Sequence, residues 1–170
     1  MDLLNEFLEN GDKTVLENLH KNIYEVNKTN TEYWDFIMNN SKIDSKTILE
    51  NINFINIDNL IKIQNLDSDL IKNDIFFNKI INEDLLNEFI IYQKLDMDTL
   101  KQIIDLNLNI DWIKLCKYQN LNIEIIENNL EKIDWNIISE NQFLTIEFIT
   151  KYKDKINWEL LGKNVKISEI

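Results

Sequence analysis

The chain has 170 residues and a formal net charge of -12, with 30 acidic residues against 18 basic residues that are all lysines. An apolar fraction of 44% with 17 aromatic residues is enough to bury a core, which excludes a disordered chain. The negative charge argues against direct binding of nucleic acid or of an anionic membrane surface, because phosphate groups require clustered Lys and Arg.

Other classes are excluded by local features. No apolar run approaches the roughly 18 residues that a membrane span needs, and the acidic start of the chain lacks the basic residues of a signal peptide. The single cysteine, Cys116, cannot form an internal disulfide. We therefore expect a cytoplasmic protein, located in the host cytoplasm if its origin is viral. Ile (30), Asn (27) and Lys (18) dominate the composition, which is typical of an AT-rich genome.

Residues 1–33 are predicted to form a helical N-terminal cap. Leu4, Leu8, Leu16 and Leu19 belong to two apolar sets at helical spacing, and a break falls at Gly11. This segment does not follow the repeat that begins after it.

A sequence repeat covers residues 34–170, which we interpret as one continuous domain with the cap. The last three copies each begin with Trp after an Ile-Asp or Ile-Asn pair, and are spaced by 23 residues. Earlier copies follow at steps of 23, 29 and 26 residues. The six copies start at Trp34, Ile57, Leu86, Trp112, Trp135 and Trp158.

Each copy is predicted to hold two short helices. The first follows an Asp or Asn cap such as Asp111 or Asp134, and places its Trp and an apolar residue three positions later on one face. A polar turn follows, and the second helix begins after another cap residue ten positions from the start, such as Asn122 or Thr145. The four tryptophans recur at one place in the repeat, so we expect them to be mostly buried.

Helices this short cannot bury an apolar face alone, but stacked copies can. The predicted fold class is therefore all-α, an α-solenoid of short two-helix repeats. Extra residues in the two longer copies fall at 76–79 and 106–108, where we expect a longer helix or loop.

The repeat resembles short two-helix repeats of the Ile-Asp-Trp type that occur in giant-virus, phage and AT-rich bacterial proteins. The stretch from Ile133 to Asn141 and the stretch from Leu144 to Ile149 carry the resemblance most clearly. The likeness is good over residues 110–167 and weaker over 34–109. It implies a scaffold fold of viral or mobile-element origin and brings no catalytic residues.

The sequence contains no constellation that indicates catalysis, a metal or a cofactor. His20 is the only histidine, and Cys116 has no histidine near it in sequence. Gly11 and Gly162 alone cannot form a phosphate-binding loop. Paired acids at the second-helix starts could suggest calcium ligation, but their recurrence in the repeat register favours helix caps. We therefore predict a non-enzymatic protein; a hydrolase has less support.

Negative charge is concentrated in residues 1–111, which carry a net charge of -11 against -1 for residues 112–170. A solvated surface would explain this asymmetry, and so would an acidic face that binds a basic protein surface. The most concrete form of the second hypothesis is a viral or phage inhibitor that mimics nucleic acid and occupies a host defence protein, in the manner of an anti-CRISPR protein. An immunity protein or a structural adaptor is the alternative. The residues predicted to form the partner-binding acidic face are Asp67, Asp69, Glu83, Asp84, Glu88, Asp96 and Asp98.

Overall fold

The computed structural model describes residues 25, 27–82, 84–106 and 108–166. The chain divides into two compact units, Met1–Gln64 and Asn65–Ile170, called here the N-terminal unit and the C-terminal unit. Most of the predicted cap, residues 1–33, lies outside the described residues.

All regular structure in the described part of the chain is helical, and no β-strand occurs there, so the all-α prediction is confirmed. The N-terminal unit contains α3 (Thr31–Asn40), α4 (Ser45–Glu50) and α5 (Ile57–Ile63). The C-terminal unit contains α6 (Ser68–Ile71), α7 (Asp74–Asn82), α8 (Leu86–Tyr92), α9 (Met97–Asp105), α10 (Trp112–Tyr118), α11 (Ile123–Glu127), α12 (Trp135–Asn141), α13 (Ile146–Lys151) and α14 (Trp158–Leu161).

Side-chain caps begin the helices where the repeat predicts them. Asp111 and Asp134 each accept hydrogen bonds from two backbone N–H groups at the starts of α10 and α12. Asp67, Asn122 and Thr145 each accept from the N–H three residues later, at N–O distances of 2.8–3.2 Å. These bonds satisfy N–H groups that have no partner inside the helix, so the predicted caps are confirmed.

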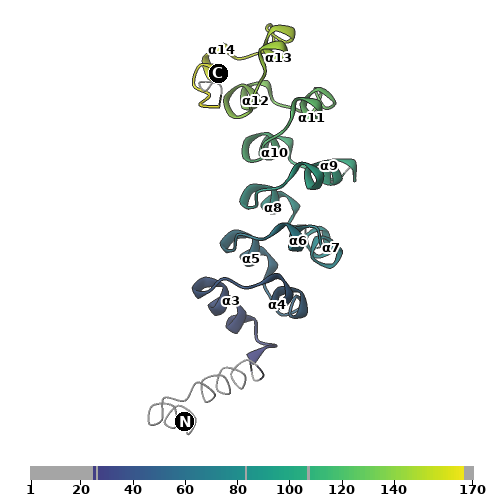
Figure 1. The fold of residues 1–170 in the computed structure, drawn as a ribbon, viewed down its shortest axis with the longest axis vertical. Coiled ribbons are helices and arrows are strands. Elements are labelled where there is room, and N and C mark those ends of the chain that lie inside the picture. Colours follow the sequence, from purple (N-terminus) through teal and green to yellow (C-terminus); the bar gives the residue numbers. More distant parts are fainter. Residues whose placement is uncertain (1–24, 26, 83, 107, 167–170) are drawn as a thin grey trace. The chain divides into compact units, whose positions relative to one another are not determined.

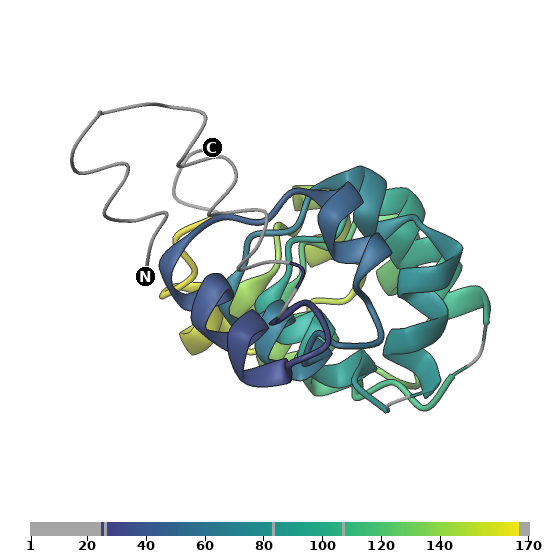
Figure 2. The same ribbon diagram turned by 90° about the horizontal axis from the view of Figure 1, so that it is seen from below.

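Two sets of helices face each other in the C-terminal unit. The first helices of successive copies pack side by side, α8 on α10, α10 on α12 and α12 on α14. Figure 1 shows them on one side and α6, α9, α11 and α13 on the other, and Figure 2 gives the view from below. The apolar residue three positions into the first helix forms the middle of the core: Phe89, Leu115 and Ile138 have no exposed surface.

A buried glutamine joins α10 to α8, the first helix of the preceding copy. Gln119 ends α10, and its side-chain amide donates hydrogen bonds to the backbone carbonyl oxygens of Ile90 and, at 2.7 Å, Gln93 at the end of α8. Its amide oxygen accepts from the N–H of Leu95 at 3.1 Å. The glutamine therefore satisfies carbonyl groups left unpaired at a helix C-terminus, together with one N–H of the following turn.

The same arrangement recurs from copy to copy, and we call it the amide ladder. Gln142 donates to Cys116 and Gln119 and accepts from Leu121, one repeat further along. In the N-terminal unit, Gln64 does the same with its own neighbours. In the last copy an asparagine makes the two donor bonds, to Ser139 and Gln142. The members of the ladder, all buried, are Gln64, Gln93, Gln119, Gln142 and Asn164.

The tryptophans are not equivalent in burial, so the expectation that all four are mostly buried is wrong. Trp34 is 2% exposed and Trp158 is 58% exposed, while Trp112 and Trp135 are half-buried. Trp135 stacks on Phe148 of α13, with ring centroids 6.1 Å apart. Trp158 lies in the last described copy, where no described second helix follows α14 to cover its ring.

The two longer copies both contain more helix than their neighbours. In the copy that starts at Ile57, the second helix α6 is followed by a third helix, α7, which includes residues 76–79 and whose Phe76 is fully buried and meets Phe89 edge to face at 6.3 Å. In the next copy the second helix, α9, has nine residues, against five in α11, but it ends at Asp105, so Leu106 and Leu108 lie in the connection that follows it.

Candidate protein-interaction surface

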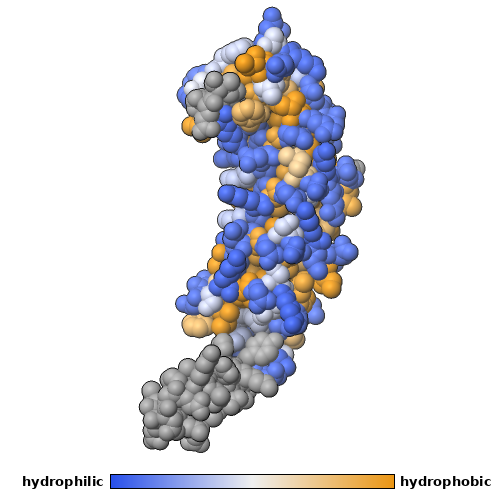
Figure 3. Space-filling model, viewed as in Figure 1, coloured by the Kyte–Doolittle hydropathy of each residue, from blue (hydrophilic) through white to orange (hydrophobic). Residues whose placement is uncertain are grey.

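Charge is divided unequally between the two sides of the C-terminal unit. The described second-helix segments carry 12 acidic residues and 5 lysines, while the first-helix segments carry 5 acidic residues and 7 lysines. We call these the second-helix layer (residues 66–82, 84, 95–106, 108–109, 122–131 and 145–154) and the first-helix layer (residues 85–94, 110–121, 132–144 and 155–166). Figure 3 shows hydrophilic side chains over much of one face, with apolar side chains exposed between them.

Three of the predicted acidic residues gather around one lysine. Lys72, at the end of α6, lies 2.6 Å from the carboxylate of Asp96, the cap of α9. Negative charge on Asp96, Asp98 and Asp69 helps to raise the pKa of Lys72, after the hydrogen bond to Asp96 itself. Asp69 and Asp98 are exposed, so this group presents carboxylates to solvent with one lysine among them.

Asp96 is bound within the chain. The hydrogen bond from Lys72 is the main reason why the pKa of its carboxyl falls to about 2, and the backbone N–H of Thr99, 2.9 Å from the carboxylate, adds to the effect. Ser68 also approaches it, at 3.5 Å. Asp96 therefore stabilises the junction of α6 and α9, and its charge is less available to a partner than those of Asp69 and Asp98.

The other predicted residues lie apart from this group or outside the description. Asp67 caps α6, where its carboxylate accepts from the N–H of Leu70 at 2.9 Å. Asp84 is exposed in the connection before α8, with a left-handed backbone (φ 55°). Glu88 lies in the first-helix layer, 4.0 Å from Lys114 of α10. Glu83 lies outside the described residues.

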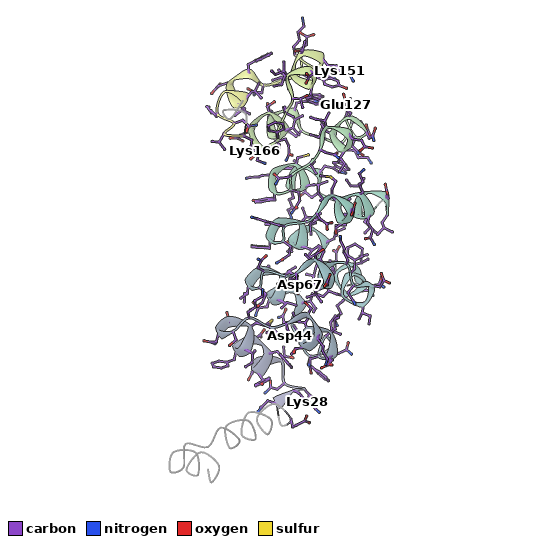
Figure 4. All side chains as sticks on the ribbon, in the orientation of Figure 1. Lys28, Asp44, Asp67, Glu127, Lys151 and Lys166 are labelled. Atoms are coloured by element: carbon purple, nitrogen blue, oxygen red, sulfur yellow. The ribbon has the colours of Figure 1, made fainter. Side chains whose placement is uncertain are left out.

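Lysine–carboxylate pairs connect successive second helices. Lys101 of α9 lies 3.2 Å from Glu124 of α11. Glu127 of α11 lies 2.8 Å from Lys151 of α13, and this pair is labelled in Figure 4. The lysine lowers the pKa of Glu127 through its hydrogen bond. These exposed pairs contribute little stability individually, but they neutralise part of the acidic layer at each junction.

A groove lies between α9 and α11. It has a volume of about 380 Å³, and a second hollow of about 440 Å³ lies beside it over the end of α9, with Lys101 and Asp105 on the boundary of both. The groove is lined by Lys101, Ile104, Asp105, Glu124, Ile125, Asn128 and Asn129, and the hollow by Asp98, Lys101, Gln102, Asp105 and Leu106. The sequence did not indicate this groove, although the longer copy contained the residues that create it.

Cys116, the cysteine of α10, is buried. Burial, and secondarily the charge of Asp134, raises the pKa of the Cys116 thiol to about 12, so the thiol stays protonated and unreactive. The described part of the chain contains no group of three or more His, Cys, Asp or Glu residues that could hold a metal ion. No described helix is long and apolar enough to cross a membrane. His20 lies outside the described residues.

Comparison of the chain with protein-family models, with curated proteins and with solved structures found no match.

Proposed function

We propose that this protein is an α-solenoid of short two-helix repeats that binds a protein partner without catalysing a reaction. The first helices pack in succession, and the amide ladder repeats the same bonds from one to the next. Repeats that contact only their neighbours leave both layers accessible along their length, and such surfaces are used for binding.

The division of charge between the layers is the observation that carries the proposal. Twelve acidic residues and five lysines lie in the described second-helix layer, so the excess negative charge is collected on one side. A surface of this kind is complementary to a basic protein surface, which it would reach by electrostatic steering. The partner is a basic, nucleic-acid-binding protein, and the protein inhibits it by occupying the site that phosphate groups use.

A host defence nuclease is the most concrete partner of this class, and the origin implied by the repeat is viral. The protein itself contacts neither nucleic acid nor membrane in this proposal and needs no cofactor. Its place of action is the cytoplasm.

The test begins with identification of the partner by affinity capture from the native host and mass spectrometry. The purified partner is then bound to labelled duplex DNA, and displacement of the DNA by the acidic protein is measured. Displacement is expected to weaken steeply between about 0.05 and 0.5 M salt, since exposed charges are screened over that range.

Charge-reversal variants test the contribution of each layer to displacement separately. Asp98→Lys with Glu131→Lys changes exposed acids of the second-helix layer, and Glu140→Lys with Glu159→Lys makes the same change in the first-helix layer. The first pair is expected to abolish displacement and the second to leave it intact, with unchanged circular dichroism in both. Equal displacement by the two double variants, at low and high salt, would refute the acidic-mimic mechanism.

A structural adaptor is the second candidate, because the first-helix layer also has features of a binding surface. Tyr92 and Tyr118 occupy the same position in adjacent first helices and are 52% and 48% exposed, and Ile113 is 54% exposed. An adaptor that bound through these side chains would retain its partner at high salt, which distinguishes it from the charge-dependent mechanism.

A further inference from the structure

The last turn of α9 has no counterpart in the neighbouring second helix. The caps Asp96 and Asn122 occupy the same position in successive copies, but α9 has nine residues and α11 has five. The four additional residues, 102–105, extend α9 by about 6 Å at 1.5 Å per residue. They lie beyond the helical part of α11, beside the turn at Asn128 and Asn129, and this difference in length leaves the groove.

The groove has a mainly polar lining with a net negative charge, and two isoleucines contribute its apolar part. Ile104 and Ile125 contribute apolar lining, and Leu106 at its end is 48% exposed. Glu124 is paired with Lys101 at 3.2 Å. Asp105 and Asp98 add two further negative charges, so the groove and the adjoining hollow together have a net charge of -2.

We propose that this groove binds an arginine side chain of the partner, in a basic segment that carries an apolar residue next to the arginine. The proposal rests on the proposed function and names the point of contact within it. The guanidinium would bind the Asp105 carboxylate, the arginine stem would lie along Ile104 and Ile125, and the apolar neighbour would cover Leu106.

Arginine suits this site better than lysine for two reasons. Its planar guanidinium can donate two parallel hydrogen bonds to one carboxylate, and it is less strongly hydrated than an ammonium group, so it loses less when it enters a half-buried groove. A cavity of about 380 Å³ is at the lower end of the range for small ligand sites, which is adequate for one long side chain and its flanking residue.

The test uses the full ¹⁵N-labelled chain and two short peptides, each with a central basic residue between leucines and with glycine and serine elsewhere. One peptide carries arginine at its centre and the other lysine. At low salt, the arginine peptide is expected to shift the backbone amide signals of Ile104, Glu124 and Asn128, and to bind at least about fivefold more tightly than the lysine peptide.

Two matched variants remove one negative charge each from the second-helix layer. Asp105→Asn lies in the groove, and Asp154→Asn lies on an exposed turn after α13. Asp105→Asn should preserve the fold, because it takes a negative charge away from a helix C-terminus. It is expected to weaken the arginine peptide by at least about fivefold, as loss of a charge-assisted bond predicts, while Asp154→Asn leaves the affinity within a factor of about two.

Failure of the groove can be told apart from failure of the proposed function. Equal effects of the two variants, or shifts confined to residues around Asp69, would overturn the arginine site while leaving an acidic layer that binds basic segments. If neither peptide binds at low salt, the arginine site is wrong, whereas the charge-based function is refuted only by equal displacement of DNA by the two double variants.

Discussion

Truncation of one ladder glutamine should destabilise the C-terminal unit far more than its polar character suggests. Gln119 is 4% exposed and makes hydrogen bonds to the carbonyl groups of Ile90 and Gln93 and to the N–H of Leu95. In Gln119→Ala all three backbone groups lose this partner, at about 1–3 kcal/mol for each buried group left unsatisfied. The lost side chain also leaves a cavity. Because water that enters the new cavity can replace part of these bonds, we expect a total of about 3–5 kcal/mol.

The measurement is urea unfolding followed by circular dichroism at 222 nm. Gln102→Ala is the matched control, since Gln102 is the one glutamine outside the ladder and is exposed on α9. Its effect should stay within about 0.5 kcal/mol, as for most surface substitutions. A Gln119→Ala midpoint equal to that of the control would show that the ladder does not hold the first helices together.

Gln142→Asn is a milder substitution in the amide ladder, and its stability can be measured even if the alanine variant does not fold. Asn164 shows that asparagine can make the two donor bonds, to Ser139 and Gln142, while its oxygen accepts instead from Lys166. Gln142→Asn should therefore keep the donor bonds and lose the bond from the N–H of Leu121, at about 1–3 kcal/mol. If Gln142→Asn lowered the free energy of unfolding as much as Gln142→Ala, the asparagine would not be keeping the two donor bonds.

Four further results are expected. Trp34→Ala should cost about 3–5 kcal/mol as a buried aromatic, whereas Trp158→Ala should cost about 1 kcal/mol or less, and equal urea midpoints would contradict their different burial. Thr145→Ala should cost about 0.5–2 kcal/mol in the same assay, because it removes the cap of α13. The folded pKa of Asp96, about 2, lies below the usual 3.8, so the stability that its carboxylate contributes is present above about pH 4 and is lost as the pH falls toward 2. The difference in melting temperature between the parent and Asp96→Asn should therefore shrink between about pH 4 and pH 2. A difference that stays constant over this interval would contradict the lowered pKa. Cys116 should react with a thiol reagent only in denaturant, and rapid reaction in the folded protein would refute its burial.

Local features of the fold could be predicted from the sequence because their causes are local. The caps Asp111, Asn122 and Thr145 act within three residues of their own position, and the apolar positions of the first helix follow from helical periodicity. The apolar positions and the second-helix cap recur in every copy, although α8 begins after Leu85 without a side-chain cap, so agreement across copies identified most of the helices without knowledge of how the copies stack.

The amide ladder was missed although its signal was visible. Four of the five glutamines stand seven positions after a repeat start, but they were interpreted as part of a polar turn. Their partners lie 21–29 residues away, so their role depends on the stacking of neighbouring copies. The pairing of Lys72 with Asp96 was missed for the same reason, because it joins two copies separated by the additional helix α7.

The acidic surface was predicted from charge counts, but its composition depends on which acids are bound within the chain. Asp67 and Asp96 cap helices, and Asp96 is also paired with Lys72. Asp69 and Asp98 are exposed in the same neighbourhood. The repeat register predicts their position two residues after the caps, but it does not predict that Lys72 pairs with Asp96.

This distinction determines which substitutions can test binding. Hydrogen bonds from buried, neutral side-chain amides join successive first helices. A neutral amide needs no opposite charge to offset its burial, so the stacking of the first helices does not depend on the acids of the second-helix layer. Reversal of Asp98 leaves the cap of α9 in place, although it puts a positive charge in the first turn of the helix and near Lys72. Reversal of Asp96 removes the cap itself and also the 2.6 Å pair with Lys72. Loss of binding in Asp96→Lys would therefore combine an effect on folding with one on recognition, whereas loss of binding in Asp98→Lys with an unchanged urea midpoint would report on recognition.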